Sequence, residues 1–322
     1  MASSTYPARS PRLALAGFYR RLRAGDQLVY LLTLASAVCI LVIVGLIVFE
    51  LWISSQATVK TFGWSFLTTS RWDPNSGKFG ALPFIYGTCV TSFLALLIAV
   101  PFGVMASIFL AELAPPRLSN ILTFLIELLA AVPSVIYGLI GIFVLLPLIR
   151  SYLAPFLSGV FGFLPLFQGD FYGVSFLSAG IVLSVMVVPF IISVSREVLL
   201  AVPVDQREAA LALGTTKWET TWQIVIPNAK AGVIGSIFLA LARALGETMA
   251  VTMVIGNTPK ISASLLAPGY SIAAVIANEF AEASGDLYIS SLIFLGLVLF
   301  GLTIVINALA RVLIITTTKR GA

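Results

Sequence analysis

Long uncharged stretches alternate with short polar segments along this chain. Six stretches are apolar over enough residues to cross a bilayer as helices: 28–49, 79–111, 128–149, 171–195, 231–259 and 287–310. A helix rises about 1.5 Å per residue, so about 20 apolar residues match the hydrocarbon layer. Only the fifth stretch contains charged residues, Arg243 and Glu247. The pattern predicts an all-α integral membrane protein with six transmembrane helices.

Two further apolar stretches are interrupted by glycine and proline. Residues 151–167 contain Pro155, Gly159, Gly162 and Pro165, and residues 261–278 contain Pro268 and Gly269. We expect neither to span the membrane. Both are typical of interfacial or re-entrant elements, which are stable only where protein or a water-filled cavity covers their backbone polar groups.

The composition supports a membrane protein. Hydrophobic residues make up 59% of the chain and charged residues 10%, at a mean hydropathy of +1.04, whereas about a quarter of a soluble domain is charged. Histidine is absent, and Cys39 and Cys89 lie inside apolar stretches. The sequence therefore indicates neither a disulfide nor a metal site. The first helix follows an arginine cluster and is long, which favours a retained anchor over a signal peptide.

The distribution of positive charges predicts the orientation. With six spans, 13 of the 19 lysines and arginines fall on the side shared by both termini, and five fall on the other side. Positive residues accumulate on the cytoplasmic side, so we expect both termini to be cytoplasmic. The expected division is a basic cytoplasmic segment over 1–26, a transmembrane domain over 27–316 and a cytoplasmic tail over 317–322. The N-terminal arginines either set orientation only or also bind anionic lipid.

A polar segment over 203–227 interrupts the apolar pattern between the fourth and fifth spans. Asp205 followed three residues later by Glu208 has the form of a capping box that starts a helix, and Gly214 ends it. Thr216 followed by Glu219 repeats the signature, and Pro227 closes the second helix before the next span. The sequence predicts two short helices joined by a glycine turn on the cytoplasmic face.

The first of these helices carries small side chains, Ala209, Ala210 and Ala212, which let another protein's backbone approach closely. Such a helix is suited to a partner's groove. The alternative is a helix pair resting on lipid, with Trp218 and Trp222 at the membrane interface.

Arg243 and Glu247 lie four residues apart in the fifth apolar stretch, so on one helix they share a face and can pair. A charge at the bilayer centre is costly, so both should face protein or a wet path. One hypothesis is a structural ion pair that joins this helix to a neighbour. The other is that the Arg243 guanidinium binds an oxyanion, with Glu247 as its resting partner. Ser134 and Tyr137 beside Pro133 are weaker candidates for contact with an anion.

Two segments carry a resemblance to a known family. Glu208-Ala-Ala, Gly214 and the residues up to Pro227 resemble the EAA loop of ABC-importer permeases, which docks on the ATPase. Residues 240–257 resemble the fifth helix of phosphate-specific importer permeases of the PstC type, and the similarity extends over about 27–311. Ala242 stands where many relatives have glycine.

The resemblance implies a type I, MetI-like architecture with its core at about 81–311 and the coupling loop at 203–227. It implies that Asp205, Glu208, Ala209, Ala210 and Gly214 contact the ATPase and that Arg243 and Glu247 line the substrate path. The implied function is a phosphate permease, with phosphate as the cargo. The implied partners are a second permease of the PstA type, a PstB-like ATPase dimer and a PstS-like extracytoplasmic phosphate-binding protein.

We expect no enzymatic activity and no cofactor in this chain. The phosphate-binding motif of ATPases is absent, because the one Gly-Lys pair, Gly77-Lys78, is followed by Phe79 and lacks the earlier glycine. ATP and Mg²⁺ would be bound by the partner ATPase.

Three alternatives stay open. A permease for another oxyanion or small solute would share the architecture, although a neutral solute gives no reason for a guanidinium inside the membrane. A membrane-embedded lipid-processing enzyme would need clustered acids or histidines at one membrane face. A secondary transporter would leave the EAA-like loop unexplained.

Overall fold

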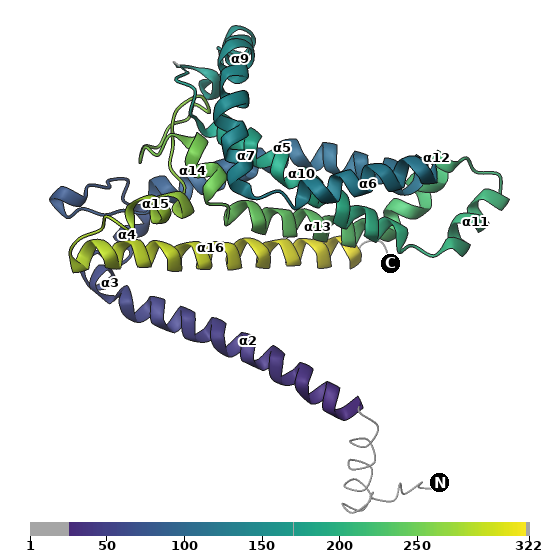
Figure 1. Ribbon diagram of the computed structural model, residues 1–322, viewed down its shortest axis with the longest axis horizontal. Helices are drawn as coiled ribbons and strands as arrows, with labels where there is room; N and C mark the ends of the chain where they lie inside the picture. The colour runs from purple at the N-terminus through teal and green to yellow at the C-terminus, as the bar shows by residue number, and fades with distance from the viewer. Residues whose placement is uncertain (1–25, 170, 320–322) are drawn as a thin grey trace, which may run out of the picture. The chain divides into compact units, whose positions relative to one another are not determined.

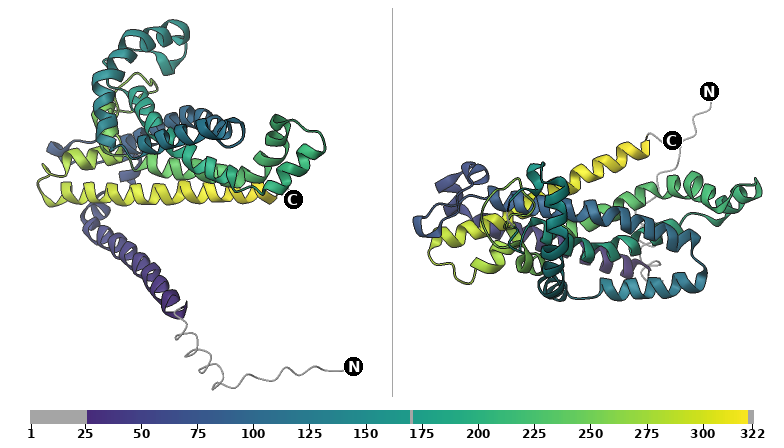
Figure 2. Two further views of the ribbon diagram at one scale, coloured as in Figure 1. Left: turned by 45° about the vertical axis from the view of Figure 1, so that its right-hand side comes forward. Right: turned by 90° about the horizontal axis from the view of Figure 1, so that it is seen from above.

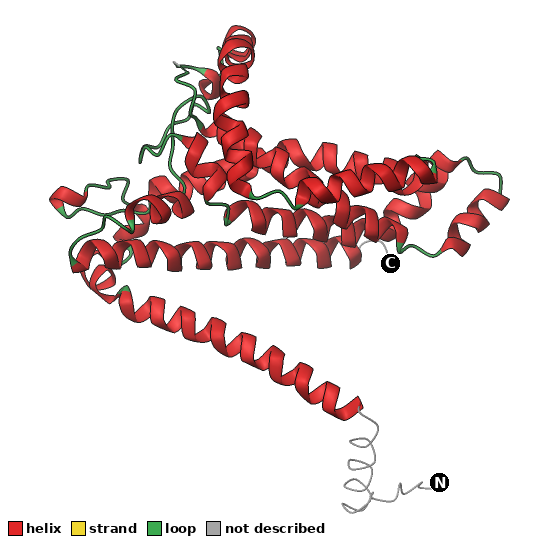
Figure 3. Cartoon of the chain, in the orientation of Figure 1, coloured by secondary structure: helices red, strands yellow, loops and turns green. Residues whose placement is uncertain are grey.

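The computed structural model describes residues 26–169 and 171–319, which form helices joined by loops (Figure 3). Six of the described helical segments are long and apolar enough to cross a membrane: Gln27–Ser54, Leu82–Leu113, Ser134–Phe161, Phe176–Leu200, Lys217–Leu245 and Asp286–Val312. The predicted number of spans is confirmed. The predicted basic segment, apart from its last residue, and residues 320–322 of the tail lie outside the described residues.

The chain divides into two compact units between Ile53 and Ser54. The first unit contains α2 (Asp26–Ser54), whose apolar side chains are almost all exposed. A helix that is hydrophobic all round is stable in lipid and not in water. Its length and composition fit a membrane span.

The second unit contains the remaining elements. In chain order these are α3 (Gln56–Phe62), α4 (Ser65–Thr68), η1 (Pro74–Ser76), α5 (Leu82–Ile108), η2 (Phe109–Leu113), α6 (Pro116–Ala130), α7 (Ser134–Ile140), η3 (Gly141–Leu145), α8 (Leu146–Leu148), η4 (Ile149–Leu153), α9 (Ala154–Phe161), η5 (Pro165–Phe167), α10 (Phe176–Leu200), α11 (Val204–Ala212), α12 (Lys217–Thr220), η6 (Thr221–Val225), α13 (Ile226–Leu245), α14 (Met249–Ile255), α15 (Ile272–Glu279) and α16 (Asp286–Lys319).

The pair α5 and α10 forms the centre of this unit (Figure 1). Glycines bring the two helices close together: a Cβ atom on Gly103 would lie 2.7 Å from Ile191, and one on Gly180 would lie 2.5 Å from Leu94. Helix α13 packs on the same pair, and the hydroxyls of Ser195 and Ser236 lie 2.6 Å apart between α10 and α13. Small residues and hydroxyl pairs are typical of helix contacts inside membranes.

The third span differs from the prediction over 128–149. Helix α6 ends at Ala130, the chain is not helical over 131–133, and a second helix then runs from Ser134 to Phe161. The predicted interruption over 151–167 is therefore wrong for its first part. Residues 162–169 and 171–175 do leave the α-helix, apart from the 3-10 turn η5, and residues 261–278 do not form a span, as predicted.

A π-helical turn precedes four of the prolines, whereas Pro101 and Pro189 lie inside α5 and α10 without one. The turns η2, η3, η4 and η6 end at Leu113, Leu145, Leu153 and Val225, and proline follows two residues later in every case, at 115, 147, 155 and 227. Proline lacks an N–H group and clashes with the carbonyl of the preceding turn. The wider π-turn relieves both problems. The helices that Pro155 and Pro227 were expected to interrupt therefore continue through both residues.

The non-helical segment over 256–271 is covered by protein. The N–H groups of Phe176 and Leu177, at the start of α10, donate to the carbonyls of Ala267 and Leu265 at 3.1 and 2.8 Å. The Tyr86 hydroxyl donates to the Ser262 carbonyl at 2.6 Å. The first N–H groups of α10 have no partner within their own helix, and they bind loop carbonyls that lipid could not hydrogen-bond.

A carboxylate organises the aromatic cluster next to this segment. Glu279 Oε2 accepts hydrogen bonds from the Trp72 indole at 2.8 Å and from the Tyr288 hydroxyl at 2.7 Å. Burial raises the pKa of nearby Tyr270 to about 12, and the Asn278 amide donates to its hydroxyl at 3.2 Å. These bonds join the 62–80 loop to α15 and α16.

The close approach between Gly87 of α5 and the Tyr270 carbonyl provides a test of the packing. A Cβ atom on Gly87 would lie 2.1 Å from the Tyr270 carbonyl oxygen, whereas one on Gly301 in α16 would meet no atom within 4 Å. We expect Gly87→Ala to destabilise the protein by about 1–3 kcal/mol through overpacking, although alanine favours helices. Thermal unfolding in detergent measures the change. Gly301→Ala is the matched control, and equal unfolding temperatures for both variants would contradict the packing.

Candidate functional site

The polar segment between the fourth and fifth spans forms the expected helix, turn and helix. Figures 1 and 2 show α11 and the turn after it extending beyond the ends of the longer helices. Helix α11 begins after Pro203 and has no side-chain cap. The predicted Asp205–Glu208 capping box is therefore wrong, because Pro203 occupies the cap position and Asp205 already lies inside the first turn. An acidic residue there still interacts favourably with the helix dipole.

The turn after α11 has the predicted glycine and the second capping box. Gly214 has φ +92°, a left-handed conformation that side-chain-bearing residues rarely adopt. Thr216 Oγ1 accepts from the Glu219 N–H at 3.2 Å, and Glu219 Oε2 accepts from the Thr216 N–H at 2.8 Å. Both bonds of the predicted box are present. The helix that it starts does not end at Pro227 but continues through η6 and α13 to Leu245.

The alanines of α11 divide between two surfaces. Ala210 is buried against the rest of the protein, whereas Ala209 and Ala212 are exposed. Asp205 and Glu208 are exposed as well. The exposed side of α11 thus combines small side chains with two acids. Trp218 and Trp222 lie 5.5 Å apart in an edge-to-face pair on α12 and η6, about half exposed.

Arg243 and Glu247 do not share a helix. Helix α13 ends at Leu245, residues 246–248 are not helical, and α14 begins at Met249. The single predicted helix over 231–259 is wrong, and the Arg243–Glu247 ion pair is wrong with it, because no salt bridge joins these two described side chains. Gly246 and Thr248 are poor helix formers on either side of Glu247, which explains the break.

The two charged side chains have separate environments. The exposed Arg243 guanidinium lies over the Phe190 ring of α10, with its carbon 5.7 Å from the ring centre. Such a cation–π contact does not neutralise the guanidinium charge. The half-buried Glu247 accepts a long hydrogen bond of 3.4 Å from the Ala250 N–H at the start of α14. Arg243 therefore carries a full positive charge next to a break between two membrane helices.

Helix α7 packs tightly against α14 near this break. A Cβ atom on Gly138 would lie 2.5 Å from the Met253 sulfur and 3.2 Å from Ala250 Cα. The Tyr137 hydroxyl donates to the Leu129 carbonyl at 2.6 Å, so its proton is already used within the protein. Ser134, half buried, makes no hydrogen bond within the described part of the chain.

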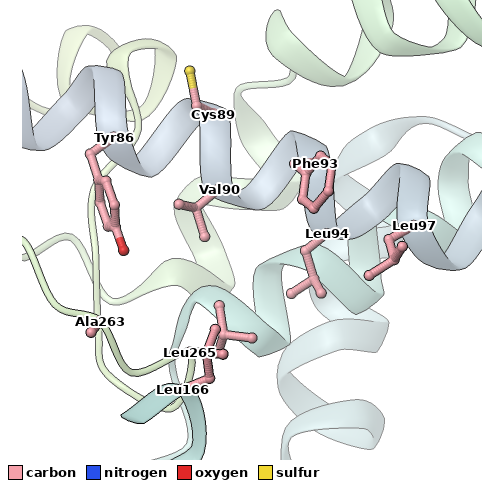
Figure 4. A pocket seen from close by; sticks show the side chains of 9 residues that line it. All are labelled: Tyr86, Cys89, Val90, Phe93, Leu94, Leu97, Leu166, Ala263 and Leu265. Carbon is pink, nitrogen blue, oxygen red and sulfur yellow. The ribbon is translucent and has the colours of Figure 1, made fainter. Parts of the chain in front are cut away.

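An apolar cavity of about 500 Å³ lies beside α5 and is not suited to an anion (Figure 4). Its lining is aliphatic and aromatic apart from the Tyr86 hydroxyl and the Cys89 thiol, and the Tyr86 hydroxyl already donates to Ser262. No charged side chain lines it, so this cavity offers no counter-charge to an anion.

One ion pair was missed by the sequence analysis. Arg207 of α11 binds Glu112 of η2, with Nη2 2.9 Å from Oε1 and Nε 3.3 Å from Oε2. Glu112 ends the second apolar stretch, and Arg207 directly precedes Glu208. The predicted topology places both on one membrane face. That placement is the only signal by which the pair could have been found.

Comparison with solved structures defines the fold. A bacterial alginate ABC transporter, solved in complex with its alginate-bound periplasmic protein, contains a chain that aligns with 92% of this one at a TM-score of 0.57; the alignment covers 96% of that chain, at 16% identity. A chain of the MetNI methionine ABC transporter, in an inward-facing conformation, aligns with 74% at a TM-score of 0.51 and 17% identity, with 94% of that chain covered. The fold is that of an ABC-importer permease.

Sequence comparison then gives the family. The sequence model of the family described as "Binding-protein-dependent transport system inner membrane component" matches residues 99–315. The chain belongs to this family, and it is a multi-pass protein of the inner membrane. It is 46% identical over 305 residues to the phosphate transport system permease protein PstC of Mesorhizobium japonicum, with 94% of this chain and 93% of the relative covered. It is 46% identical to the Xylella fastidiosa PstC, with 99% and 96% covered.

The second capping box provides a test of the turn geometry. Replacing a threonine N-cap with alanine removes an acceptor for the Glu219 N–H and costs about 0.5–2 kcal/mol of helix stability. We expect Thr216→Ala to accelerate amide hydrogen exchange over 217–220, where the helix begins. Thr216→Ser keeps a hydroxyl in the same place and is the matched control. Unchanged exchange in the alanine variant would show that the box does not hold this turn.

Proposed function

We propose that this chain is the permease subunit of an ABC importer that carries inorganic phosphate into the cell. The observation that carries the proposal is the similarity, over nearly the whole of both chains, to relatives that are named as phosphate transport permeases, 46% identical over 322 residues in one case. This observation favours phosphate over the other oxyanions that the same architecture could carry.

Arg243 supports a role in contact with the anion. Its guanidinium is exposed beside a helix break and makes no salt bridge within the described residues. A charge in that position is stable only when it faces water, substrate or a partner, and not acyl chains. The planar fork of five N–H donors matches two oxygens of a tetrahedral anion. Arg243 would bind phosphate transiently as it passes the break.

Glu247 would set which protonation state of phosphate is accepted. Its carboxylate lies four residues after Arg243, with only a long hydrogen bond to the Ala250 N–H. A carboxylate accepts a hydrogen bond from the P–OH group of a singly charged phosphate but repels a fully ionised one. Because the two side chains do not pair in this structure, Arg243 needs no displacement of Glu247 before it binds an anion.

The energy would come from a partner. We place the EAA-like loop and both termini on the cytoplasmic side, where Asp205, Glu208, Ala209, Ala210 and Gly214 would form the surface that meets the ATPase. Of these, all but Ala210 are exposed, so Ala210 would support the helix from beneath.

The proposed assembly contains a second permease, an ATPase dimer that binds ATP and Mg²⁺, and an extracytoplasmic phosphate-binding protein. This chain would hydrolyse no ATP and hold no cofactor of its own, because it lacks a phosphate-binding loop motif.

The glycine turn tests the docking role of α11. Nothing in this chain lies within 4 Å of a Cβ atom on Gly214, so within the subunit a substitution there acts through the backbone conformation. A β-branched residue at φ +92° costs on the order of 1 kcal/mol or more and redirects the turn. We expect Gly214→Val to insert normally but to lose copurifying ATPase and phosphate uptake together. Gly214→Asn tolerates positive φ and is the control. Full ATPase retention in the valine variant would contradict docking through this turn.

Arg243 can be tested by separating charge from geometry. Arg243→Lys keeps the charge but loses two-point binding, and we expect complexes that assemble yet import labelled phosphate at least about tenfold more slowly, a loss of roughly 1.4 kcal/mol. Glu247→Gln should still assemble and should shift the pH dependence of uptake. Near-normal uptake by Arg243→Ala combined with Glu247→Ala would exclude a role in phosphate handling. Competition by sulfate in the unmodified complex would instead indicate a different oxyanion.

A further inference from the structure

The Arg207–Glu112 pair joins the proposed coupling helix to the centre of the fold. Arg207 lies in α11, and Glu112 lies in η2, the π-helical turn that ends the second membrane span. The guanidinium makes two hydrogen bonds to the carboxylate, from Nη2 at 2.9 Å and from Nε at 3.3 Å. Two-point pairing fixes the relative orientation of the two side chains as well as their distance.

The same guanidinium also binds the end of α10. Nη2 donates to the Leu199 carbonyl at 2.7 Å, and Nη1 donates to the Val202 carbonyl. The last carbonyls of a helix have no partner within it and carry partial negative charge. A single side chain of α11 therefore holds both Glu112, at the end of the α5 span, and the C-terminal end of α10.

The pair is sheltered from water. The Arg207 side chain is 16% exposed and the Glu112 side chain 10%, whereas in the pair Arg196–Glu197 the arginine is 14% exposed but the glutamate 73%. An exposed pair contributes little because water and salt screen it. Removing one member of a sheltered pair leaves the other without a partner, which is strongly unfavourable. The Arg207 contact is thus a firm connection.

A second side-chain hydrogen bond joins α11 to α13 and not to the α5–α10 pair. Gln206 Oε1 accepts from the Asn228 amide at 2.9 Å, and this contact to α13 is exposed to solvent. Helices α5 and α10, by contrast, pack closely through Gly103 and Gly180. A force on α11 would therefore reach the α5–α10 pair through Arg207 more directly than it reaches α13 through Gln206.

We infer that Arg207, paired with Glu112, is a positioning residue that transmits displacement of α11 to the α5–α10 pair and so couples ATP hydrolysis to substrate movement. The inference rests on the proposed function, because it takes α11 as the helix that the ATPase moves. Arg207 touches neither substrate nor nucleotide in this role. It acts by keeping α11 in a fixed orientation on the two helices that form the centre of the fold.

The test uses the complete importer, reconstituted in vesicles with its binding protein, and measures phosphate uptake and ATP hydrolysis in the same preparation. Glu112→Gln and Arg207→Met keep the approximate shape but remove the charge pairing. We expect the ratio of phosphate imported to ATP hydrolysed to fall at least about fivefold, the lower end of typical coupling between sites. Glu197→Gln is the matched control, since it removes the exposed carboxylate of the Arg196–Glu197 pair by the same change and should leave the ratio unaltered.

A purely structural role gives a different result. If the pair only stabilised the fold or the docking surface, uptake and ATP hydrolysis would fall together at a constant ratio, which would overturn the inference. An unchanged ratio with normal activities would overturn it as well. Partial recovery of the ratio in the charge-exchanged double variant, Arg207→Glu with Glu112→Arg, would support direct pairing. A failure of the proposed function is distinguishable, because the unmodified complex would then hydrolyse ATP without importing phosphate.

Discussion

The structure depends on one constraint: hydrocarbon offers no hydrogen-bond partners, so each interruption of a membrane helix must be covered by protein or water. The loop over 256–271 shows how this is achieved. The first N–H groups of α10, which have no partner within their own helix, donate to its carbonyls, and Tyr86 of α5 donates to Ser262. Gly87 lacks a side chain where the Tyr270 carbonyl approaches. The carbonyls of the loop and the first N–H groups of α10 are each other's hydrogen-bond partners, which allows non-helical backbone beside the central helix pair.

The same constraint applies to the helix break at 246–248, where polar groups need a partner that lipid cannot provide. Its backbone is not covered as completely as that loop, since Gly246 is exposed, Glu247 is half buried and the Arg243 guanidinium is exposed. Lipid cannot stabilise such a site, so water, a partner subunit or a passing anion must. A structural ion pair between Arg243 and Glu247 would have removed this requirement by neutralising both charges. The absence of that pair in this conformation favours a site that is accessible over one that serves packing alone.

Features that depend on hydropathy or on the backbone preference of single residues could be predicted from the sequence. Features that depend on where the backbone hydrogen bonds of a helix stop or continue could not. Six spans followed from hydropathy, and the Gly214 turn and the Thr216–Glu219 box followed from backbone preferences. Hydropathy does not register where a helix breaks, so Arg243 and Glu247 were placed on one helix although Gly246 and Thr248 favour a break. Prolines at 155 and 227 do not end their helices, and a π-turn precedes each of them. The Arg207–Glu112 pair joins residues 95 positions apart, and a single sequence contains no signal that selects this pairing from others on the same face.

Helix α10 connects the regions on which transport would depend. Its first N–H groups hold the loop over 256–271, Phe190 near its middle lies against Arg243, and its last carbonyls bind Arg207. Pro189 interrupts the hydrogen bonds of α10, but Phe190 and Leu199 both lie on its C-terminal side, in one packed helical segment. We therefore expect a displacement at the Arg207 end to reach Phe190, where the contact with Arg243 is a soft cation–π interaction and not a fixed bond. The firm connection is thus the Arg207–Glu112 pair beside α11, and the adjustable one is the contact between Phe190 and Arg243. Motion of α11 would therefore be transmitted by the first and would change the surroundings of Arg243 at the second.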